Sequence, residues 1–593
     1  MKHNARVLGM TAALAALAGC SVQSQQTAGI DAGRPAPMRL SALGGAPEAP
    51  AASVTAPPID LTDGSVAQVS FAEMEIIDTR TFPKQIDVTP GDGKRRVKEI
   101  LPPHTRPAKI KPDIAGEVVG AVLEEARTIP DAKFPGIAAT PWTPPDPTLA
   151  VGPGHIVSTV NMDIAWYTKS GTLQFQSRLD NTGSPGFFEG VGAGGFTFDP
   201  KCFYDHYSGR FIVLALEVYD PNQAWCTFAV SDDSDPNGVW YKYRTNAVVT
   251  VGSDTFWVDY PGFGYDQDAY YITGNLFGLN NGGFAGAFFR VLPKAPLLTG
   301  GTAVIKDLRD GNTYSVQAAQ TFGTAQAQYF VTDESTTQMR IIAVRNALTT
   351  PTLSTTFVTV PSFAYPSSGA PNQGGGTADV LDGRIMNVHW RNGKLYAGHG
   401  VRISSKNQAR WYEFNTNNWP TSGSVTLNQS GNVDGGSGVH TWFPALYSNK
   451  FGDVGIVMAR SSSTTYCNVA YTGRKATDAA GTMGALQQAA IGNATASGRW
   501  GDYFDIAIDP VNEATFWLIG EYQTGGGWGT WISSFNISYC PADLNKDGFV
   551  NGDDYDLFAD AFDAGLPAAD FDKNGFVNGD DYDAFAAAFD AWC

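Results

Sequence analysis

The sequence predicts an all-β protein with a small α-helical module at its C-terminus. Between residues 130 and 539 no long helical period appears, and short runs of β-branched and aromatic residues alternate with Gly, Asn, Asp and Pro. Hydrophobic residues make up 43% of the chain and aromatic residues 12%, which is enough for a large buried core. Residues 541–593 differ, because there an acidic segment occurs twice and each copy precedes a helical pattern.

The predicted strands fall into units of similar size. Residues 199–205, 210–218, 225–231 and 240–244 are expected to form four successive strands. Four antiparallel strands over about 45 residues is the size of one β-propeller blade, so we predict a β-propeller of about seven four-stranded blades. Six or eight blades remain open, and a two-sheet sandwich is the alternative fold. The other units are a strand over 155–168 with a turn at 169–171, and the regions 259–291, 313–344, 385–414, 441–471 and 500–537.

Several short segments carry a resemblance to a known family. Residues 146–153, 198–205, 235–240 and 499–503 resemble those of secreted bacterial β-propellers distantly akin to the sialidase superfamily. The resemblance spans residues 131–539. Its motifs are mainly structural, so it implies a fold and does not point to a functional site. The turn at 235–240 is similar to the sialidase Asp-box, although Asp233 stands where the family has serine.

Propeller ligands bind where the first strands of the blades converge, so residues at the starts of those strands are the candidates. Neighbouring Asp and Tyr could supply a general acid, a base or a nucleophile, and tryptophans offer flat faces to sugar rings. Structural roles in turns and between sheets are the alternative, most of all for His389. His440 follows a glycine-rich loop and is expected to be exposed. The candidates at these strand starts are Asp259, Tyr260, His389, Trp390, His440, Trp442, Arg499, Asp502 and Tyr503.

No catalytic constellation can be named from the chain. It has no Gly-x-Ser-x-Gly elbow, no His-Glu-x-x-His helix and no phosphate loop, and no spacing groups three arginines as a sialidase requires. The first hypothesis is therefore a protein that binds carbohydrate or another surface ligand. The alternative is a glycoside hydrolase, sialidase-like or otherwise polysaccharide-degrading.

The duplicated segment has the spacing of a calcium loop. Residues 543–554 recur as 570–581, with oxygen-bearing side chains at loop positions 1, 3, 5, 9 and 12 and Gly at position 6. The backbone carbonyl of position 7 would complete each ligand set, so we predict two Ca²⁺ ions. A solvated acidic tail is the alternative. The predicted ligands are Asp543, Asn545, Asp547, Phe549, Asn551 and Asp554 in the first loop and Asp570, Asp572, Asn574, Phe576, Asn578 and Asp581 in the second.

Residues 540–593 resemble the type I dockerin module, since two such loops are each followed by a short helix and carry Asp at position 12. The resemblance implies that the ends of the module lie close together, which would allow a Cys540–Cys593 disulfide. It also implies docking to a cohesin-like or other partner, although positions 10 and 11 are Gly-Asp here rather than small hydroxyl residues. The helices are expected to pack through two aromatic stripes, Tyr555, Phe558, Phe562 and Tyr582, Phe585, Phe589.

The acidity of the chain is concentrated in this module. The net charge is -18, and residues 541–593 contribute -11 of it through 13 Asp and two Lys, which leaves -7 for the rest. The charge is therefore explained by metal binding, and nothing indicates a nucleic-acid partner.

The N-terminus predicts export. Lys2 and Arg6 precede an apolar run over 7–18, and Leu17-Ala18-Gly19-Cys20 resembles a bacterial lipobox, which implies lipidation at Cys20. Ser21 after the cysteine points to an outer-membrane or cell-surface lipoprotein with the lipid as its only membrane contact; an ordinary secretory signal is the alternative. Residues 21–107 are predicted to be a disordered Ala/Pro-rich linker, 108–130 a short helix and lead-in, 131–539 the propeller and 540–593 the calcium module.

Three cysteines test the strand assignment. Cys202 and Cys226 are placed on the first and third strands of one blade, about 9.6 Å apart, which is beyond the reach of a disulfide. Cys202, Cys226 and Cys467 are therefore predicted to be buried thiols.

Overall fold

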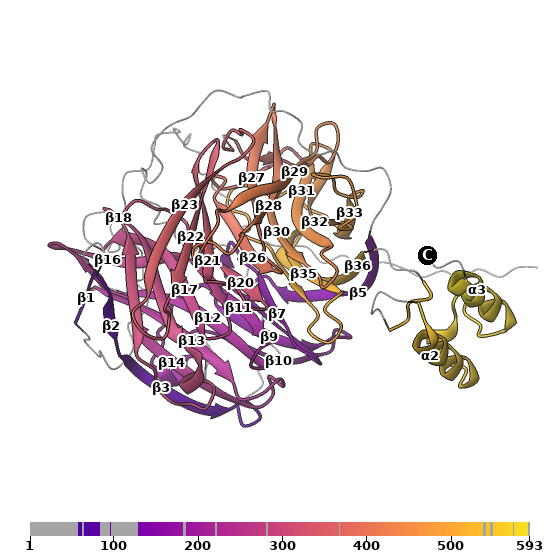
Figure 1. Ribbon diagram of the computed structural model, residues 1–593, viewed down its shortest axis with the longest axis horizontal. Coiled ribbons are helices and arrows are strands. Elements are labelled where there is room, and N and C mark those ends of the chain that lie inside the picture. The colour runs from indigo at the N-terminus through magenta and orange to yellow at the C-terminus, as the bar shows by residue number, and fades with distance from the viewer. Residues whose placement is uncertain are drawn as a thin grey trace, which may run out of the picture. The chain divides into compact units, whose positions relative to one another are not determined.

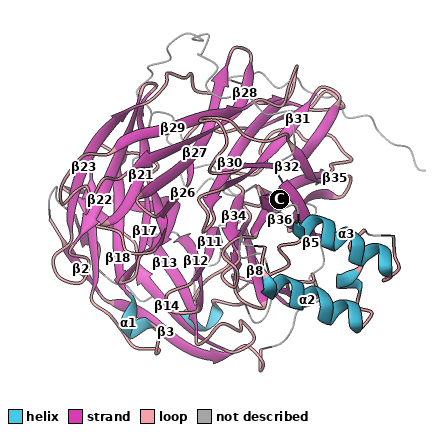
Figure 2. Ribbon diagram, turned by 45° about the vertical axis from the view of Figure 1, so that its right-hand side comes forward, coloured by secondary structure: helices cyan, strands magenta, loops and turns pink. Residues whose placement is uncertain are grey.

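The computed structural model describes residues 57–61, 65–82, 95–96, 128–181, 186–219, 222–279, 283–366, 368–537, 541–545, 550–572 and 574–590. These residues are mostly β, with strands β1 to β36 and three α-helices (Figure 1, Figure 2). The predicted lipidation site, residues 108–127 of the predicted helix and lead-in, and the Cys540–Cys593 pair lie outside the described residues. No helix in the described part of the chain is long and apolar enough to cross a membrane.

Most strands form antiparallel groups of four that follow one another along the chain. The first group contains β7 (Thr148–Val151), β8 (His155–Val160), β9 (Asp163–Thr168) and β10 (Leu173–Arg178). The second contains β11 (Thr197–Asp205), β12 (Arg210–Tyr219), β13 (Gln223–Ser231) and β14 (Val239–Asn246). The third contains β16 (Asp254–Tyr265), β17 (Ala269–Gly278), β18 (Phe284–Pro293) and β19 (Ile305–Asp310).

The later groups repeat this plan. The fourth contains β20 (Gln317–Phe322), β21 (Gln328–Ser335), β22 (Gln338–Arg345) and β23 (Thr352–Thr359). The fifth contains β26 (Ile385–Arg391), β27 (Lys394–Ile403), β28 (Lys406–Asn415) and β29 (Thr426–Val433). The sixth contains β30 (His440–Ser448), β31 (Val454–Ser462), β32 (Thr465–Arg474) and β33 (Gln487–Ala490). The last contains β34 (Asp505–Ile508), β35 (Phe516–Thr524) and β36 (Gly527–Ile537), joined by β5 (Thr128–Ala138).

Short elements lie between or beside the groups. They are β15 (Val249–Val251), β24 (Ala370–Pro371), β25 (Thr377–Ala378), β4 (Arg95–Arg96), β6 (Trp142–Thr143), α1 (Lys294–Leu297) and the 3-10 turns η2 (Glu189–Val191) and η3 (Pro567–Ala569).

The first strands of the groups contact one another in chain order. β7 lies against β11, β11 against β16, β16 against β20, β20 against β26, β26 against β30 and β30 against β34, and β34 in turn contacts β7. Two of these contacts are parallel ladders, with Tyr265 opposite Gln320 and Ala319 opposite Val388. The starts of these strands, where ligand residues were predicted, are therefore brought together.

The predicted linker is wrong for the residues that the structure describes within it. β1 (Ile59–Asp60) pairs with β15, β2 (Ala67–Val69) with β19 and β3 (Phe71–Asp78) with β14. The segment 57–82 thus adds strands to the edges of two neighbouring groups. Composition misled the prediction, because the backbone hydrogen bonds that order an edge strand come from distant residues and leave no local signal.

Two boundaries also differ from the prediction. β5 begins at Thr128, so the sheet starts three residues before the predicted start of the propeller at residue 131. Residues 155–168 form two strands, β8 and β9, rather than one, because the chain turns at Asn161-Met162, where Met162 has φ 74°. Pairing of Thr159 with Ile164 and of Val160 with Asp163 fixes this hairpin.

The cysteine predictions agree with the structure. Cys202 lies on β11 and Cys226 on β13, with β12 between them, and both are free and buried. Cys467 on β32 is also a free, buried thiol.

Two helices follow the acidic loops. α2 (Gly552–Asp563) and α3 (Gly579–Asp590) pack their predicted aromatic stripes on each other. The Phe558 and Phe585 rings, both fully buried, stack 4.0 Å apart and nearly parallel, and the hydroxyls of Tyr555 and Tyr582 are 2.8 Å apart.

Candidate functional site

A strained bend recurs at the first strands. Asp146, Asp199, Tyr260 and Phe443 all have positive φ, between 46° and 53°, and each is followed by proline. Three of these bends interrupt the ladder of the first strand with a bulge. Positive φ is costly for residues other than glycine, and such strain concentrates at sites that position functional groups. The bends therefore mark one end of the first strands as a candidate site.

Five carboxyl groups gather near these bends: Asp146, Asp199, Asp259, Asp502 and Glu521, which we call the carboxylate cluster. Burial raises the pKa of Asp146, Asp259 and Glu521 well above its usual value, and neighbouring carboxylates raise it further. The negative charges of Asp502 and Asp199 raise the pKa of both Asp146 and Asp259. The pKa of Asp199 is also raised, chiefly by burial. Such shifts are typical of functional sites, though structural networks share them.

Asn161, at the turn between β8 and β9, ties two members of the cluster together. Its Nδ2 donates a hydrogen bond of 2.7 Å to Asp146 Oδ2, and its Oδ1 accepts one of 2.9 Å from the backbone N–H of Asp199. A single buried amide thus positions carboxyl groups from two strand groups.

Two arginines face the cluster, and both are ion-paired. Arg499 pairs with Asp502 and, at 3.2 Å, with Asp379. The Nε of Arg384 lies 2.8 Å from Asp382 Oδ1, and its guanidinium carbon lies 4.4 Å from the centre of the Tyr260 ring. Each guanidinium therefore already has a carboxylate partner.

Exposure separates the members of the cluster. Asp146 is 1% exposed, whereas the side chain of Asp502 is 16% exposed and Asp259 is half-buried. Asp259 and Asp502 are therefore the members that a ligand from solvent could reach, whereas Asp146 is covered.

The predicted aromatic and histidine candidates lie elsewhere or are used in packing. Tyr260 and Tyr503 are buried, and their hydroxyls donate to the carbonyls of Ile385 and Pro200. Trp442 is fully buried beside Trp500, so it offers no face to a sugar. The same holds for Trp390, which is 5% exposed and donates its indole N–H to Thr416.

The two predicted histidines, His440 and His389, are buried as well. His440 is 7% exposed and accepts a hydrogen bond from the backbone of Asn407, so the prediction of an exposed His440 is wrong. The glycine-rich loop before it does not determine its exposure, because the side chain is covered by β28. His389 lies fully buried between the Gln320 carbonyl and the Ser448 hydroxyl, and burial lowers its pKa well below the usual value.

A small polar cavity lies among the first strands, and its lining does not include the five residues of the carboxylate cluster. It has a volume of about 30 Å³ and is lined by residues of several first strands, among them Thr148, Lys201, Gln317, Asn387 and Asp505. This is room for water and not for a sugar. Burial lowers the pKa of Lys201 to about 8 and raises that of Asp505 to about 7.

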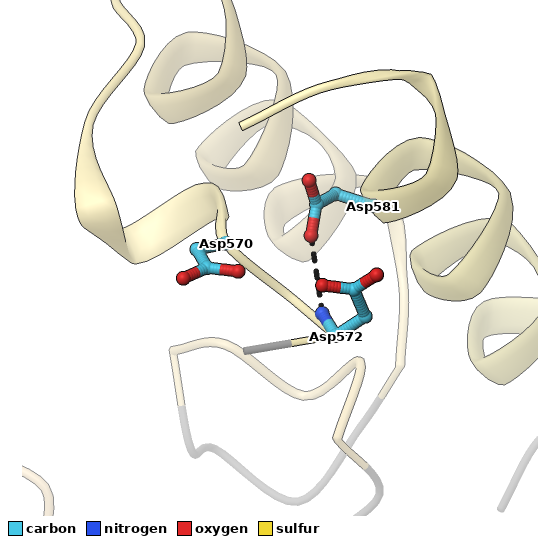
Figure 3. A group of neighbouring side chains, drawn as sticks. All are labelled: Asp570, Asp572 and Asp581. Carbon is cyan, nitrogen blue, oxygen red and sulfur yellow. Dashed lines mark hydrogen bonds between the residues drawn. The ribbon is translucent and has the colours of Figure 1, made fainter. Parts of the chain in front are cut away.

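The second acidic loop brings three predicted calcium ligands together. Carboxylate oxygens of Asp570, Asp572 and Asp581 all lie within 4.8 Å of one another (Figure 3). Asp581 accepts hydrogen bonds from the backbone N–H groups of Asp572 and Asn578, at 3.1 and 2.9 Å. Gly575 at loop position 6 has φ +90°, which explains the glycine there.

The described part of the first loop has the same geometry. Asp554 accepts from the backbone N–H groups of Asn545 and Asn551, at 3.1 and 3.0 Å, and is fully buried like Asp581. Asp547 and Phe549 lie outside the described residues. The two loops therefore share one fold where both can be compared.

Comparisons with known proteins give distant structural similarity only. No protein-family model matches the chain, and no curated protein matches it. A protein of unknown function from Dyadobacter fermentans is 10% identical, with a TM-score of 0.32, covering 71% of this chain and 99% of its own. An α-L-arabinofuranosidase from Fusarium graminearum is 9% identical, with a TM-score of 0.33, covering 69% and 98%. The Trypanosoma rangeli sialidase is 10% identical, with a TM-score of 0.30, covering 61% and 56%. Similarity at this level carries no conclusion about function.

Sequence reasoning placed Asp259, Asp502 and Arg499 in the site and missed Asp146, Asp199, Glu521 and Arg384. Asp146 and Asp199 had a signal, because each begins an Asp-Pro pair at the start of a strand unit. Glu521 had no such signal, because it lies on β35, the second strand of its group, whereas the prediction considered only the starts of first strands.

Proposed function

We propose that the β-strand region is a seven-bladed β-propeller that acts on carbohydrate at the carboxylate cluster. The sequence of contacts from β7 through β34 and back to β7 supports the propeller. So does the completion of the last group by β5, since joining the two ends of the chain in one sheet is how a circular array can be closed.

The observation that carries the function is that Asp259 and Asp502 are the two incompletely buried members of the cluster and that the charge of Asp502 acts on Asp259. Burial and neighbouring carboxylates raise the pKa of Asp259 well above its usual value, which favours the protonated acid. Asp502 is ion-paired with Arg499, and an ion pair requires its carboxylate form. Two carboxyl groups held in different protonation states are the requirement for acid and base roles in glycoside hydrolysis.

The function is accordingly that of a glycoside hydrolase, with Asp259 as general acid and Asp502 as base or nucleophile. The second candidate is carbohydrate binding without cleavage, favoured by the ion pair between Asp502 and Arg499, which engages the residue proposed as base or nucleophile. Trp442 and Trp390 are buried and provide no stacking platform for either candidate.

One experiment separates the two candidates. The full chain is incubated with a panel of polysaccharides, and both retention and the release of reducing ends are measured for the protein and for Asp259→Asn and Asp502→Asn. Cleavage lost in both variants supports the hydrolase; retention without cleavage supports binding alone. An exposed residue of the same strand, changed as Asp254→Asn, is the matched control. Absence of both retention and cleavage contradicts the proposal.

The C-terminal helices and loops are proposed to form a dockerin-like module that binds two Ca²⁺ ions. The clustering of Asp570, Asp572 and Asp581, and the matching geometry of the two loops, support it. The module would dock to a cohesin-like or other partner. The protein is proposed to be exported and anchored by lipid at Cys20, with no nucleic-acid partner.

A further inference from the structure

The polar cavity among the first strands is lined by one buried polar atom without a partner. Gln317, on β20, lines the cavity and is 4% exposed. Its Nε2 has no hydrogen-bond partner among the described residues. Buried polar groups in folded proteins are nearly always hydrogen-bonded, either to protein or to ordered water. The Gln317 amide therefore requires an acceptor inside the cavity.

A cation and a carboxylate line the same cavity. Lys201 lies on β11 and Asp505 on β34, and the charge of Asp505 acts on the Lys201 ammonium group. In the part of the chain that the structure describes, the two groups nevertheless form no hydrogen bond and no ion pair with each other. Asp505 instead accepts from two backbone N–H groups, Leu149 at 3.2 Å and Ile506 at 2.9 Å. The space between the two charges is therefore open to a third group.

The Lys201 ammonium group also has donors to spare. An ammonium group carries three N–H donors. The contact of Lys201 Nζ with the Tyr503 ring, 3.0 Å from the ring centre, directs the positive charge at an aromatic face. An aromatic face does not replace the lone pairs that the remaining donors need, so Lys201, like Gln317, requires an acceptor on the side of the cavity.

The volume of the cavity fits small acceptors of this kind. It is about 30 Å³. A buried cavity needs roughly 10 to 15 Å³ to hold one water molecule, so this one has room for about two.

We infer that the cavity is a hydration site, in which ordered water accepts hydrogen bonds from the Gln317 amide and the Lys201 ammonium group and donates to the Asp505 carboxylate. Water suits this lining because it donates and accepts at once. A chloride ion would lie beside Asp505, and a metal cation would lie beside Lys201, so either ion would meet a like charge. The water joins three strand groups, those of β11, β20 and β34, through their first strands. The inference is independent of the proposed carbohydrate function.

A crystal structure of the full chain tests the site directly. We expect electron density for water within hydrogen-bonding distance of Gln317 Nε2 and of Lys201 Nζ or the Asp505 carboxylate. Crystals grown in NaBr identify an anion site by the anomalous signal of bromide. Crystals pressurised with xenon identify a dry cavity, because xenon enters empty apolar space. We expect neither bromide nor xenon in the cavity.

Urea unfolding tests the water in solution. Gln317→Met keeps the approximate length of the side chain and removes its amide. If water fills the cavity, the variant takes a partner from it, and the urea midpoint should fall. If the cavity is dry, the variant removes an unpaired polar group, and the midpoint should rise. Gln488→Met changes an exposed glutamine of β33 and is the matched control, with an unchanged midpoint.

Four outcomes would overturn the inference: a cavity without electron density, xenon in the cavity, a bromide peak there, or a raised or unchanged urea midpoint for Gln317→Met. If that variant does not fold, the crystal structure of the unaltered chain decides the question. If the full chain does not crystallise, the direction of the midpoint shift decides it. Failure of the protein to bind or cleave polysaccharide would leave all of these results unchanged.

Discussion

The Nζ atom of Lys201, on β11, lies 3.0 Å from the centre of the Tyr503 ring. Tyr503 comes two residues before β34, so the ammonium group of one first strand rests on an aromatic ring next to another first strand. Asp505, 8% exposed, acts on the same ammonium and lies two residues beyond Tyr503. Both the aromatic ring and the carboxylate stabilise the positive charge of Lys201. Lys201 belongs to one strand group, and Tyr503 and Asp505 lie at the start of another. The pair therefore connects the groups that begin with β11 and β34.

Replacing Lys201 should destabilise the protein more at about pH 7.5 than at pH 5, because pH 7.5 lies between the pKa of Asp505, about 7, and that of Lys201, about 8. In Lys201→Met the carboxylate of Asp505 loses its cation, which should cost on the order of 2 kcal/mol at about pH 7.5. At pH 5 Asp505 is protonated, because its pKa is about 7, and the cost should be smaller. Urea unfolding at the two pH values measures the difference, with exposed Lys133→Met as control. An equal cost at both pH values would contradict the coupling.

The raised carboxyl pKa values predict a second pH effect. A carboxyl with a raised pKa in the folded state holds its proton after the unfolded chain has lost it, so stability falls as pH rises from about 4 towards 7. Asp505, with a pKa of about 7, contributes a slope of up to about 1.4 kcal/mol per pH unit in this window. Comparison of the unfolding free energy of the protein with that of Asp505→Asn isolates the contribution. A variant with an unchanged slope would contradict the assignment.

An ion pair should connect the N-terminal strand β3 to β14 and contribute to the stability of the protein. Glu75 on β3 lies 3.2 Å from the Nζ of Lys242, which is fully buried. Glu75→Gln removes the partner of a buried cation and should cost about 2 to 3 kcal/mol. Glu73→Gln, on the same strand, is the control and should stay within about 0.5 kcal/mol. Thermal unfolding measures both, and similar values for the two variants would indicate that the pair has no special role.

The calcium sites should be separable by mutation. Asp581→Ala removes the carboxylate on which the second loop is built, so calcium uptake should fall from two ions to one. Calorimetry with CaCl₂ counts the ions, and Asp583→Ala, exposed on α3, should leave the count at two. A chelator should unfold the helices of the unaltered module, seen by circular dichroism. Two ions in the Asp581 variant would reject the ligand assignment.

The stacked rings in the helical module provide a last prediction. Phe558→Ala removes a fully buried ring that stacks on Phe585, and should cost about 3 to 5 kcal/mol in so small a core. Leu557→Ala, next to it and 47% exposed, should cost little. The calcium concentration at which helicity reaches half its maximum should therefore rise for the first variant only. A shift of equal size in both variants would place the core elsewhere.

By itself the sequence determined the features that are local. Strand runs bounded by Gly, Asn and Pro, the spacing of the loop carboxylates at 570, 572 and 581, and the aromatic stripes of the two helices depend on short-range periodicity, which one chain displays directly. The two-strand separation of Cys202 and Cys226 followed from the same periodicity.

Only the tertiary structure decided what depends on distant partners. It placed β3 beside β14, buried Trp442 and His440, and brought Asp146, Asp199 and Glu521 to Asp259 and Asp502. Edge pairing, exposure and the pKa of a carboxyl group are set by groups hundreds of residues away, through backbone hydrogen bonds, burial and charge. No local pattern encodes these distances, which is why the sequence could indicate part of the carboxylate cluster and the fold was needed to assemble it.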